Sequence, residues 1–122
     1  DGSLIVIIAT DAPLLPHQLK RVAKRVSLGM SRTGAIGGNG SGDIFLAFST
    51  ANSEAAKGLG RTQLEALPNG QLDPIFAATA YATEEAIVNA LVAAEDMTGH
   101  EISAKALPHE DVKELLKKHG RL

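Results

Sequence analysis

The sequence contains no cysteine, few aromatic residues, no excess of basic charge and no long apolar run. Without cysteine there are no disulfide frameworks, no thiol catalysis and no thiolate metal sites. This absence does not determine the compartment, for which we favour the cytoplasm, with the periplasm as the alternative. Twelve Lys and Arg stand against 14 Asp and Glu, so the charge pattern does not favour a nucleic-acid partner. The longest apolar run lies between Leu4 and Thr10, far short of the roughly 20 residues of a membrane span. We therefore expect a soluble chain with no membrane partner.

Small residues take the place of the missing aromatics. Aromatic residues make up 3% of the sequence, whereas glycine occurs 12 times among 122 residues. The core is therefore expected to consist of aliphatic and small side chains with closely approaching backbones. The length fits one domain or half of a larger one. Because the sequence begins at Asp1 rather than Met, we expect a processed product or a fragment of a longer chain.

Hydrophobic periodicity predicts an α/β chain. The β-branched run Leu4–Ala9 predicts a strand buried on both faces. An amphipathic helix is predicted from Pro16 through Met30, with Gly34 as its stop. The remaining predicted elements are a strand over 44–50, a surface excursion over 51–72, a helix over 73–98 closed by Gly99 with a possible break at 81–83, an extended piece over 102–107 and a helix over 108–119 capped by Gly120.

Two or three strands and three helices do not close a layered core well, since a central strand needs a neighbour on each edge. Part of the sheet is missing from this sequence. We expect the chain to complete its fold with another polypeptide or with an upstream part of its own precursor.

A glycine-rich loop over 37–43 precedes the second predicted strand. A phosphate cradle is disfavoured, because no helix follows the loop and no Lys-Ser or Lys-Thr pair is present. A plain flexible turn remains an alternative. It does not explain why Ser41 and Asp43 lie two residues apart at the start of a strand, where alternation would point both side chains to the same side.

Ser3 is the second candidate site residue, immediately before the first strand. A serine hydroxyl is a weak nucleophile until a base takes its proton, and a free α-amine with a pKa of about 7.7–8.0 serves this purpose in N-terminal nucleophile enzymes. Gly2 would accept the strained backbone needed for attack of the Ser3 hydroxyl on the Gly2 carbonyl. An ordinary loop serine is the alternative.

Three motifs in order carry a family resemblance. They are Gly2-Ser3-Leu4-Ile5-Val6-Ile7-Ile8-Ala9-Thr10-Asp11-Ala12-Pro13-Leu14, Gly40-Ser41-Gly42-Asp43 before a strand, and Ala82-Thr83-Glu84-Glu85-Ala86-Ile87-Val88-Asn89-Ala90-Leu91. Together they resemble the small β-subunit of the L-aminopeptidase/D-esterase and β-peptidyl aminopeptidase family, over nearly all 122 residues. The resemblance implies a four-layer αββα sandwich, similar to Ntn hydrolases in architecture but different in connectivity, and completed by a larger α-subunit from the same precursor.

The resemblance also implies roles for single residues. Self-cleavage at Gly2-Ser3 would make Ser3 the nucleophile, with its amine or Ser41 handling the proton and Asp43 forming a supporting pair with Ser41. Asp43 stands where the β-peptidyl branch has Glu. Residues 1–122 would form one β-subunit, the C-terminal part of the precursor, in an oligomer of αβ pairs. The substrate would be a peptide or aminoacyl amide or ester, with oxyanion and amine contacts mostly from the α-subunit.

Other polar residues are expected to carry no chemistry. The four histidines, at 17, 100, 109 and 119, lack metal-ligand spacing beside a carboxylate, and neither a metal nor another cofactor is expected. The basic face of the first helix, Lys20, Arg21, Lys24 and Arg25, is interpreted as solvated. Two alternatives to the aminopeptidase remain. One is a same-family amidohydrolase or an acyltransferase with another acyl substrate, and the other is a noncatalytic α/β module whose glycine loop binds an anion.

Overall fold

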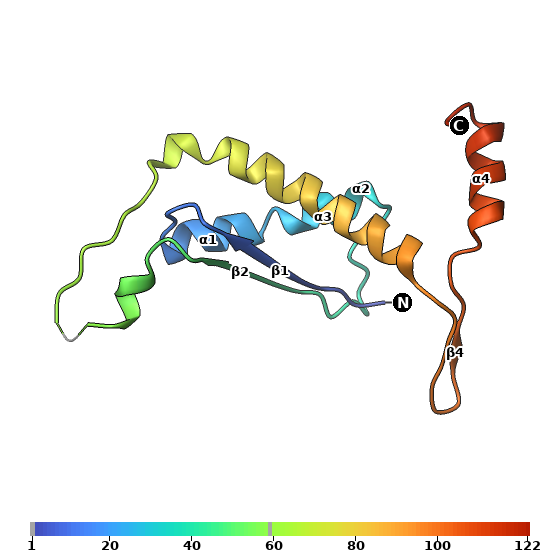
Figure 1. Ribbon diagram of the computed structural model, residues 1–122, viewed down its shortest axis with the longest axis horizontal. Coiled ribbons are helices and arrows are strands. Elements are labelled where there is room, and N and C mark those ends of the chain that lie inside the picture. The colour runs from blue at the N-terminus through green and yellow to red at the C-terminus, as the bar shows by residue number, and fades with distance from the viewer. Residues whose placement is uncertain (1, 59) are drawn as a thin grey trace. The chain divides into compact units, whose positions relative to one another are not determined.

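The computed structural model describes residues 2–58 and 60–122; Asp1 and Leu59 lie outside the described residues. The chain divides into two compact units, one ending at Glu84 and one running from Glu85 to Leu122. Each unit is described by itself below. Figure 1 shows the elements of both.

A two-stranded parallel sheet forms the base of the first unit (Figure 1). Strand β1 (Ile5–Thr10) pairs with β2 (Ile44–Ser49), with Ile5 opposite Ile44 and Thr10 opposite Ser49. Parallel strands need a crossover connection, and residues 11–43 supply it through two helices. Both strands were predicted within a residue of their observed ends.

The crossover contains α1 (Pro16–Ala23) and α2 (Val26–Arg32) rather than the single predicted helix. The helix begins as expected, because Pro16 occupies the first turn and the Gln18 side chain accepts a hydrogen bond from the Leu15 amide at 2.9 Å. The prediction of one continuous helix was wrong, since the Arg25 amide bonds to the Val22 carbonyl at 2.8 Å and breaks the α-helical pattern. After α2, Gly34 ends the helical segment with φ +94°, as predicted.

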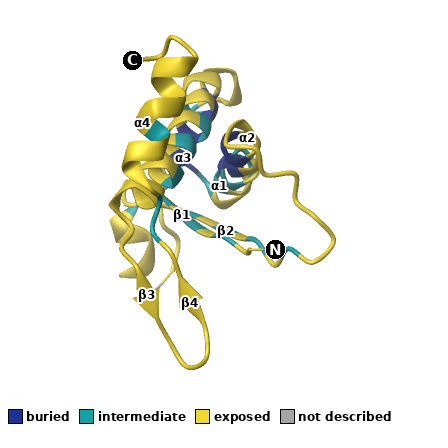
Figure 2. Ribbon diagram, turned by 90° about the vertical axis from the view of Figure 1, so that its right-hand side faces the viewer, coloured by how far each residue is buried: buried dark blue, intermediate teal, exposed yellow. Residues whose placement is uncertain are grey.

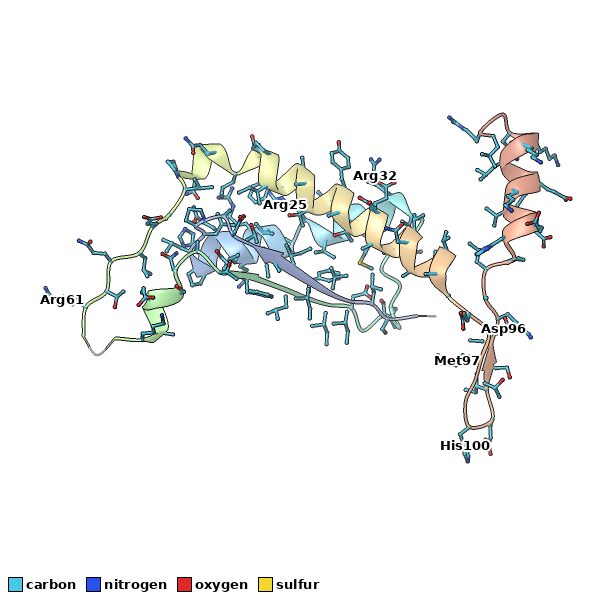
Figure 3. All side chains as sticks on the ribbon, in the orientation of Figure 1. Arg25, Arg32, Arg61, Asp96, Met97 and His100 are labelled. Atoms are coloured by element: carbon cyan, nitrogen blue, oxygen red, sulfur yellow. The ribbon has the colours of Figure 1, made fainter. Side chains whose placement is uncertain are left out.

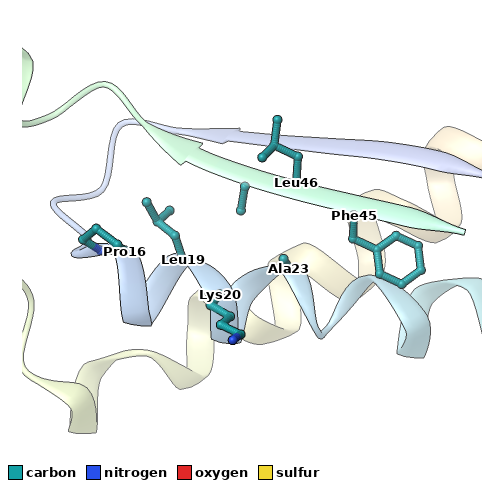
Figure 4. A pocket seen from close by; sticks show the side chains of 7 residues that line it. Pro16, Leu19, Lys20, Ala23, Phe45 and Leu46 are labelled. Atoms are coloured by element: carbon teal, nitrogen blue, oxygen red, sulfur yellow. The ribbon is translucent and has the colours of Figure 1, made fainter.

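The core of the first unit lies between these helices, one face of the sheet and the start of α3 (Asp73–Ala93) (Figure 2). It is aliphatic apart from one aromatic ring, and its buried members are Leu14, Val22, Leu72 and Phe76. Close-up geometry in Figure 4 shows Phe45 pointing from β2 toward the helices while Leu46 points to the opposite face. The space between α1 and β2 is a shallow cavity of about 280 Å³.

Helices α2 and α3 pack at very close backbone approach. A Cβ added to Gly29 of α2 would lie 2.6 Å from the Thr83 Cβ of α3. Polar contacts reinforce this packing (Figure 3): the Arg25 guanidinium lies 3.9 Å from the centre of the Phe76 ring, and Arg32 forms an ion pair with Glu84. The Glu84 carboxylate raises the pKa of Arg32 through this hydrogen bond. The expectation of small residues at close approach is met here.

Helix α3 is continuous, without the possible break at 81–83. Thr83 lies inside the helix, where its hydroxyl donates to the Thr79 carbonyl at 2.8 Å, so it does not begin a new one. The helix ends at Ala93, five residues before the predicted end, because the following segment turns into a hairpin. By length and composition alone α3 could also cross a membrane, a test that the core helix of a soluble protein passes as well. The buried residues of α3 are Phe76, Thr79 and Thr83.

The excursion between β2 and α3 contains only two short 3-10 helices, Ser53–Ala56 and Asn69–Gln71, among its described residues. Asn52 holds the two sides together, since its side chain accepts from the Glu65 amide at 2.9 Å and donates to the Glu65 carbonyl at 3.0 Å. The end of the segment is anchored by buried Gln18, which donates to the Leu67 carbonyl at 2.8 Å. The predicted surface excursion is confirmed for most of its described residues, but its last residue, Leu72, is buried in the core.

The second unit contains the end of α3, a small hairpin and α4 (His109–Lys118). The hairpin pairs β3 (Met97–Thr98) with β4 (Ser103–Ala104), and His100 lies at its tip (Figure 3). Gly99, predicted as a helix stop, is instead part of this turn and donates to the Ile102 carbonyl at 2.9 Å. The predicted extended piece over 102–107 is therefore shorter. Gly120 follows α4 with φ +64°, as expected of a helix cap.

The opposite face of the β1–β2 sheet is uncovered. Ile5 and Ile7 of β1 are 70% and 60% exposed, and Ile44 and Leu46 of β2 are 59% and 55% exposed. Within this chain the expectation of a strand buried on both faces was wrong, because the helices cover one face only. The expectation of an incomplete sheet is consistent with this asymmetry.

Candidate active site

The segments at residues 2–4 and 41–43 lie side by side at the starts of β1 and β2. The parallel register brings them together, since pairing begins at Ile5 and Ile44 and the Ile44 amide donates to the Leu4 carbonyl at 3.0 Å. A turn precedes the second segment, and in it the Ser41 amide donates a hydrogen bond to the Gly38 carbonyl at 2.9 Å. Just before it, Gly37 adopts φ +61°, a conformation that L side chains disfavour.

Three hydrogen bonds join the two segments, and each involves one of the predicted site residues. The Gly42 amide donates to the Ser3 hydroxyl oxygen at 2.9 Å. The Ser41 hydroxyl donates to the Gly2 carbonyl at 3.5 Å. The Asp43 carboxylate accepts a hydrogen bond from the Leu4 amide at 2.8 Å. The fold thus brings Ser3, Ser41 and Asp43 to one place, although they are about 40 positions apart in the sequence.

The three side chains do not form a direct chain of hydrogen bonds. Among the residues that the structure describes, no hydrogen bond joins the Ser3 hydroxyl to Ser41 or Asp43. The partners of Ser3 and Asp43 are instead the backbone amides of Gly42 and Leu4. Sequence reasoning did not single out these amides, because a backbone N–H carries no residue-type signal.

Strand alternation assigns Ser3 and Asp43 to different faces of the sheet. Ser3 is exposed and continues the alternation of Ile5 and Ile7, so it belongs to the uncovered face. Asp43 is half-buried and continues the alternation of Phe45 toward the helices. It borders a cavity of about 440 Å³ whose other lining residues include Met30, Ile36 and Phe45. The site therefore spans the sheet edge rather than lying in one closed pocket.

The remaining sequence candidates take structural roles. Arg21 of α1 and Arg25, the N-cap of α2, are half-buried and lie over the Phe76 ring at 5.1 Å and 3.9 Å. The prediction of a solvated basic face was wrong for these two residues, whereas Lys20 and Lys24 are exposed as predicted. The histidines lie in a first helical turn, at the hairpin tip, at the start of α4 and at its C-cap, as the sequence indicated. Within residues 2–58 and 60–122, no three His, Asp or Glu side chains gather in a way that could hold a metal ion.

Comparison with known proteins decides the family. The sequence profile of peptidase family S58 matches residues 1–104. This chain belongs to peptidase family S58.

Several S58-related proteins show how the chain compares with longer relatives. It is 54% identical over 124 aligned residues to the beta-peptidyl aminopeptidase BapA of Sphingosinicella microcystinivorans, covering all of this chain and 31% of that protein. The crystal structure of the PH0078 protein from Pyrococcus horikoshii OT3 matches with a TM-score of 0.89 and 47% identity, over 98% of this chain and 34% of that one.

The l-aminopeptidase d-ala-esterase/amidase of Ochrobactrum anthropi matches with a TM-score of 0.86 and 46% identity, over 97% of this chain and 34% of that one. That protein is described as a prototype for the serine aminopeptidases and as a new variant of the Ntn hydrolase fold. Our chain therefore has the mixed α/β fold of about one third of an S58 aminopeptidase of this Ntn-variant type. The resemblance stated from sequence is confirmed.

Proposed function

We propose that residues 1–122 form the smaller, C-terminal subunit of a self-cleaving serine aminopeptidase whose nucleophile is Ser3. It would release N-terminal amino acids from peptides, amides or esters. The observation that carries this proposal is the pair of hydrogen bonds at the Gly2-Ser3 peptide: Gly42 donates to the Ser3 hydroxyl and Ser41 donates to the Gly2 carbonyl. In this proposal Ser3 is the nucleophile, and the Gly2-Ser3 peptide bond is the bond that it cuts.

Self-cleavage follows from this arrangement in two steps. In the first, the Ser3 hydroxyl oxygen attacks the Gly2 carbonyl carbon and gives up its proton, the Gly2-Ser3 C–N bond breaks, and the Ser3 nitrogen takes a proton, which leaves an ester. Ser41, 3.5 Å from the Gly2 oxygen, stabilises the negative charge that develops there. In the second step, water hydrolyses the ester, so Gly2 becomes a carboxylate and the Ser3 hydroxyl is restored beside the amine that the first step freed.

Hydrolysis of substrates then reuses the same hydroxyl. The free α-amine, with an ordinary pKa of about 7.7–8.0, accepts the Ser3 proton near neutral pH. The oxygen attacks the carbonyl of the substrate's first residue, the leaving amine or alcohol takes a proton, and an acyl-enzyme ester remains. Water cleaves that ester and releases the amino acid. No metal or cofactor enters any step.

A larger partner completes the molecule in this proposal. The relatives are about three times as long as the chain, and the sheet leaves Ile5, Ile7 and Leu46 uncovered on the side of Ser3. An apolar sheet face of this kind is normally buried in a sandwich or layered fold. We therefore assign this face to the larger α-subunit of the precursor, with αβ pairs assembled into a homo-oligomer.

The substrate class follows from the relatives. One is named a beta-peptidyl aminopeptidase and another an l-aminopeptidase. We propose peptides or aminoacyl amides with an α- or β-amino acid at the N-terminus. Contacts to the substrate's amine and side chain belong mainly to the α-subunit in this account.

The test uses the full-length precursor with Ser3→Ala, compared with wild type and with Ser53→Ala, a control in an exposed serine of the 3-10 helix. Each protein is assayed with α- and β-aminoacyl p-nitroanilides and examined by denaturing electrophoresis. We expect Ser3→Ala to stay uncut and to lose at least about a thousandfold in activity, since the nucleophile is gone. Wild-type turnover by Ser3→Ala would refute the proposal.

A further inference from the structure

Asp43 contacts the backbone next to the nucleophile and not the nucleophile itself. Its Oδ1 accepts the Leu4 amide at 2.8 Å in a partly buried contact. The Leu4 carbonyl in turn accepts the Ile44 amide at 3.0 Å. Both backbone polar groups of the residue that follows Ser3 are therefore held by the start of β2.

The Asp43 side chain takes the place of a backbone acceptor. Continuing the parallel ladder beyond the Ile44–Leu4 bond would require the Leu4 amide to bond to the carbonyl of residue 42. The Leu4 amide instead donates its hydrogen bond to the carboxylate of Asp43. A partly buried amide without an acceptor is unfavourable, so this side chain is what fixes the first rung of the ladder at Leu4.

The position of Ser3 depends on that rung. With Leu4 fixed, the Ser3 hydroxyl oxygen lies 2.9 Å from the Gly42 amide. The fit is tight, because a Cβ on Gly42 would come within 3.3 Å of the same oxygen. A small shift of the backbone at Leu4 would therefore break the contact between Ser3 and Gly42.

We propose that Asp43 is a positioning residue, which holds Ser3 against the Gly42 amide through the Leu4 backbone, and that it is not the base for Ser3 or Ser41. This inference rests on the proposed function, in which Ser3 is the nucleophile. What the role requires of residue 43 is an acceptor oxygen that reaches the Leu4 amide, and a negative charge is not required. The amide oxygen of Asn meets this requirement as well as a carboxylate does.

The experiment compares Asp43→Asn with Asp43→Ala in the full-length precursor. Self-cleavage, kcat and KM for an aminoacyl p-nitroanilide are measured from pH 5 to pH 9, with circular dichroism as the check on folding. We expect Asp43→Asn to keep kcat within about threefold of wild type with an unchanged pH profile. Asp43→Ala should lose at least about tenfold in kcat with KM changed less than about twofold, because misplacement of a nucleophile slows chemistry more than binding.

Several results would overturn the positioning role. One is a folded Asp43→Asn protein as slow as Asp43→Ala, or one that has lost a limb of the pH profile, since either means that the charge or the proton of Asp43 is needed. Wild-type kcat in Asp43→Ala would also overturn it. If Asp43→Ala fails to fold, Asp43→Asn decides alone: near-wild-type kcat supports the role and a hundredfold loss contradicts it.

Ser3→Ala separates this inference from the proposed function. If the Ser3→Ala protein is active, Ser3 is not the nucleophile, and both the proposed function and the positioning role of Asp43 are refuted. An inactive Ser3→Ala protein together with an inactive, folded Asp43→Asn protein overturns the positioning role alone.

Discussion

The two faces of the β1–β2 sheet have the same apolar character and opposite surroundings. On one face, Phe45 and Ala47 are half-buried, and Figure 4 shows Phe45 pointing toward the helices. On the other, Ile7 and Leu46 are more than half exposed. Isolated exposed apolar residues are ordinary, but a continuous apolar sheet face is not. This chain therefore covers one face of its sheet only, and Ser3 lies on the uncovered side.

A charge placed on the uncovered face of the sheet is expected to have the largest effect on stability. We expect Ile7→Asp in the full-length precursor to lower the free energy of unfolding by about 3 kcal/mol or more, since the carboxylate would be buried between two layers. Chemical denaturation of the purified protein measures this.

Leu28→Asp is the matched control for that substitution. Leu28 of α2 is 55% exposed, close to the 60% of Ile7, and is not on the sheet. We expect it to change the free energy of unfolding by less than about 1 kcal/mol. Equal, small effects at both positions would mean that the sheet face stays in water in the whole protein.

The site at the sheet edge provides the next effect. We expect Ser41→Ala to lower both the rate of self-cleavage and kcat by about tenfold to a hundredfold while folding is retained. The lost hydroxyl donates to the carbonyl under attack, which is that of Gly2 in self-cleavage and that of the substrate in turnover. Denaturing electrophoresis over time and p-nitroanilide hydrolysis measure the two rates. Unchanged rates, equal to those of Ser53→Ala, would remove Ser41 from the site.

A single added methyl group tests how closely α2 packs against α3. Gly29→Ala is expected to lower the free energy of unfolding by about 1–3 kcal/mol, because the new Cβ would overlap the Thr83 side chain of α3. At Gly70 an added Cβ meets nothing within 4 Å, so Gly70→Ala is the control. A stabilised Gly29→Ala protein would show that α2 and α3 do not pack this closely.

The smallest effect is expected in the second unit, where polar contacts hold the hairpin. The Lys105 ammonium, and then the Ala106 amide, lower the pKa of Asp96 by hydrogen bonding to its carboxylate. A group with a lowered folded pKa stabilises the fold above its unfolded pKa and ceases to do so as pH falls through the folded value. We expect the Ala106 amide signal in NMR to shift below about pH 4. An Asp96→Asn protein should lack that transition, and its persistence there would assign it to another group.

Much of the fold was predictable, and the failures share a cause. Local patterns identified β1, β2 and α4 because strand runs and helix caps are read from adjacent residues. The break between α1 and α2 was missed because the hydrophobic stripe continues through it, while Arg25 is held by Phe76, 51 positions away. The end of α3 was missed because the hairpin contacts of Asp96 lie outside any local helix signal.

The candidate site shows the same division between side chains and backbone. Ser3, Ser41 and Asp43 were singled out from residue type and spacing, and the fold brings them together. The partners of Ser3 and Asp43 are the amides of Gly42 and Leu4, and the partner of Ser41 is the Gly2 carbonyl. These backbone groups become visible only when the register of the two strands is known. Pairing of β1 with β2 sets that register, so the roles of Ser41 and Asp43 could not be separated from the sequence.

The most direct test of the central claim is the intact mass, under denaturing conditions, of the protein purified after expression of the full-length precursor. We expect the wild-type precursor to give two chains in equal amounts, the smaller one beginning at Ser3. The Ser3→Ala precursor should give a single uncut chain. A wild-type precursor that stays whole, or one cut at a bond other than Gly2-Ser3, would contradict the assignment of Ser3 as the nucleophile of a self-cleaving aminopeptidase.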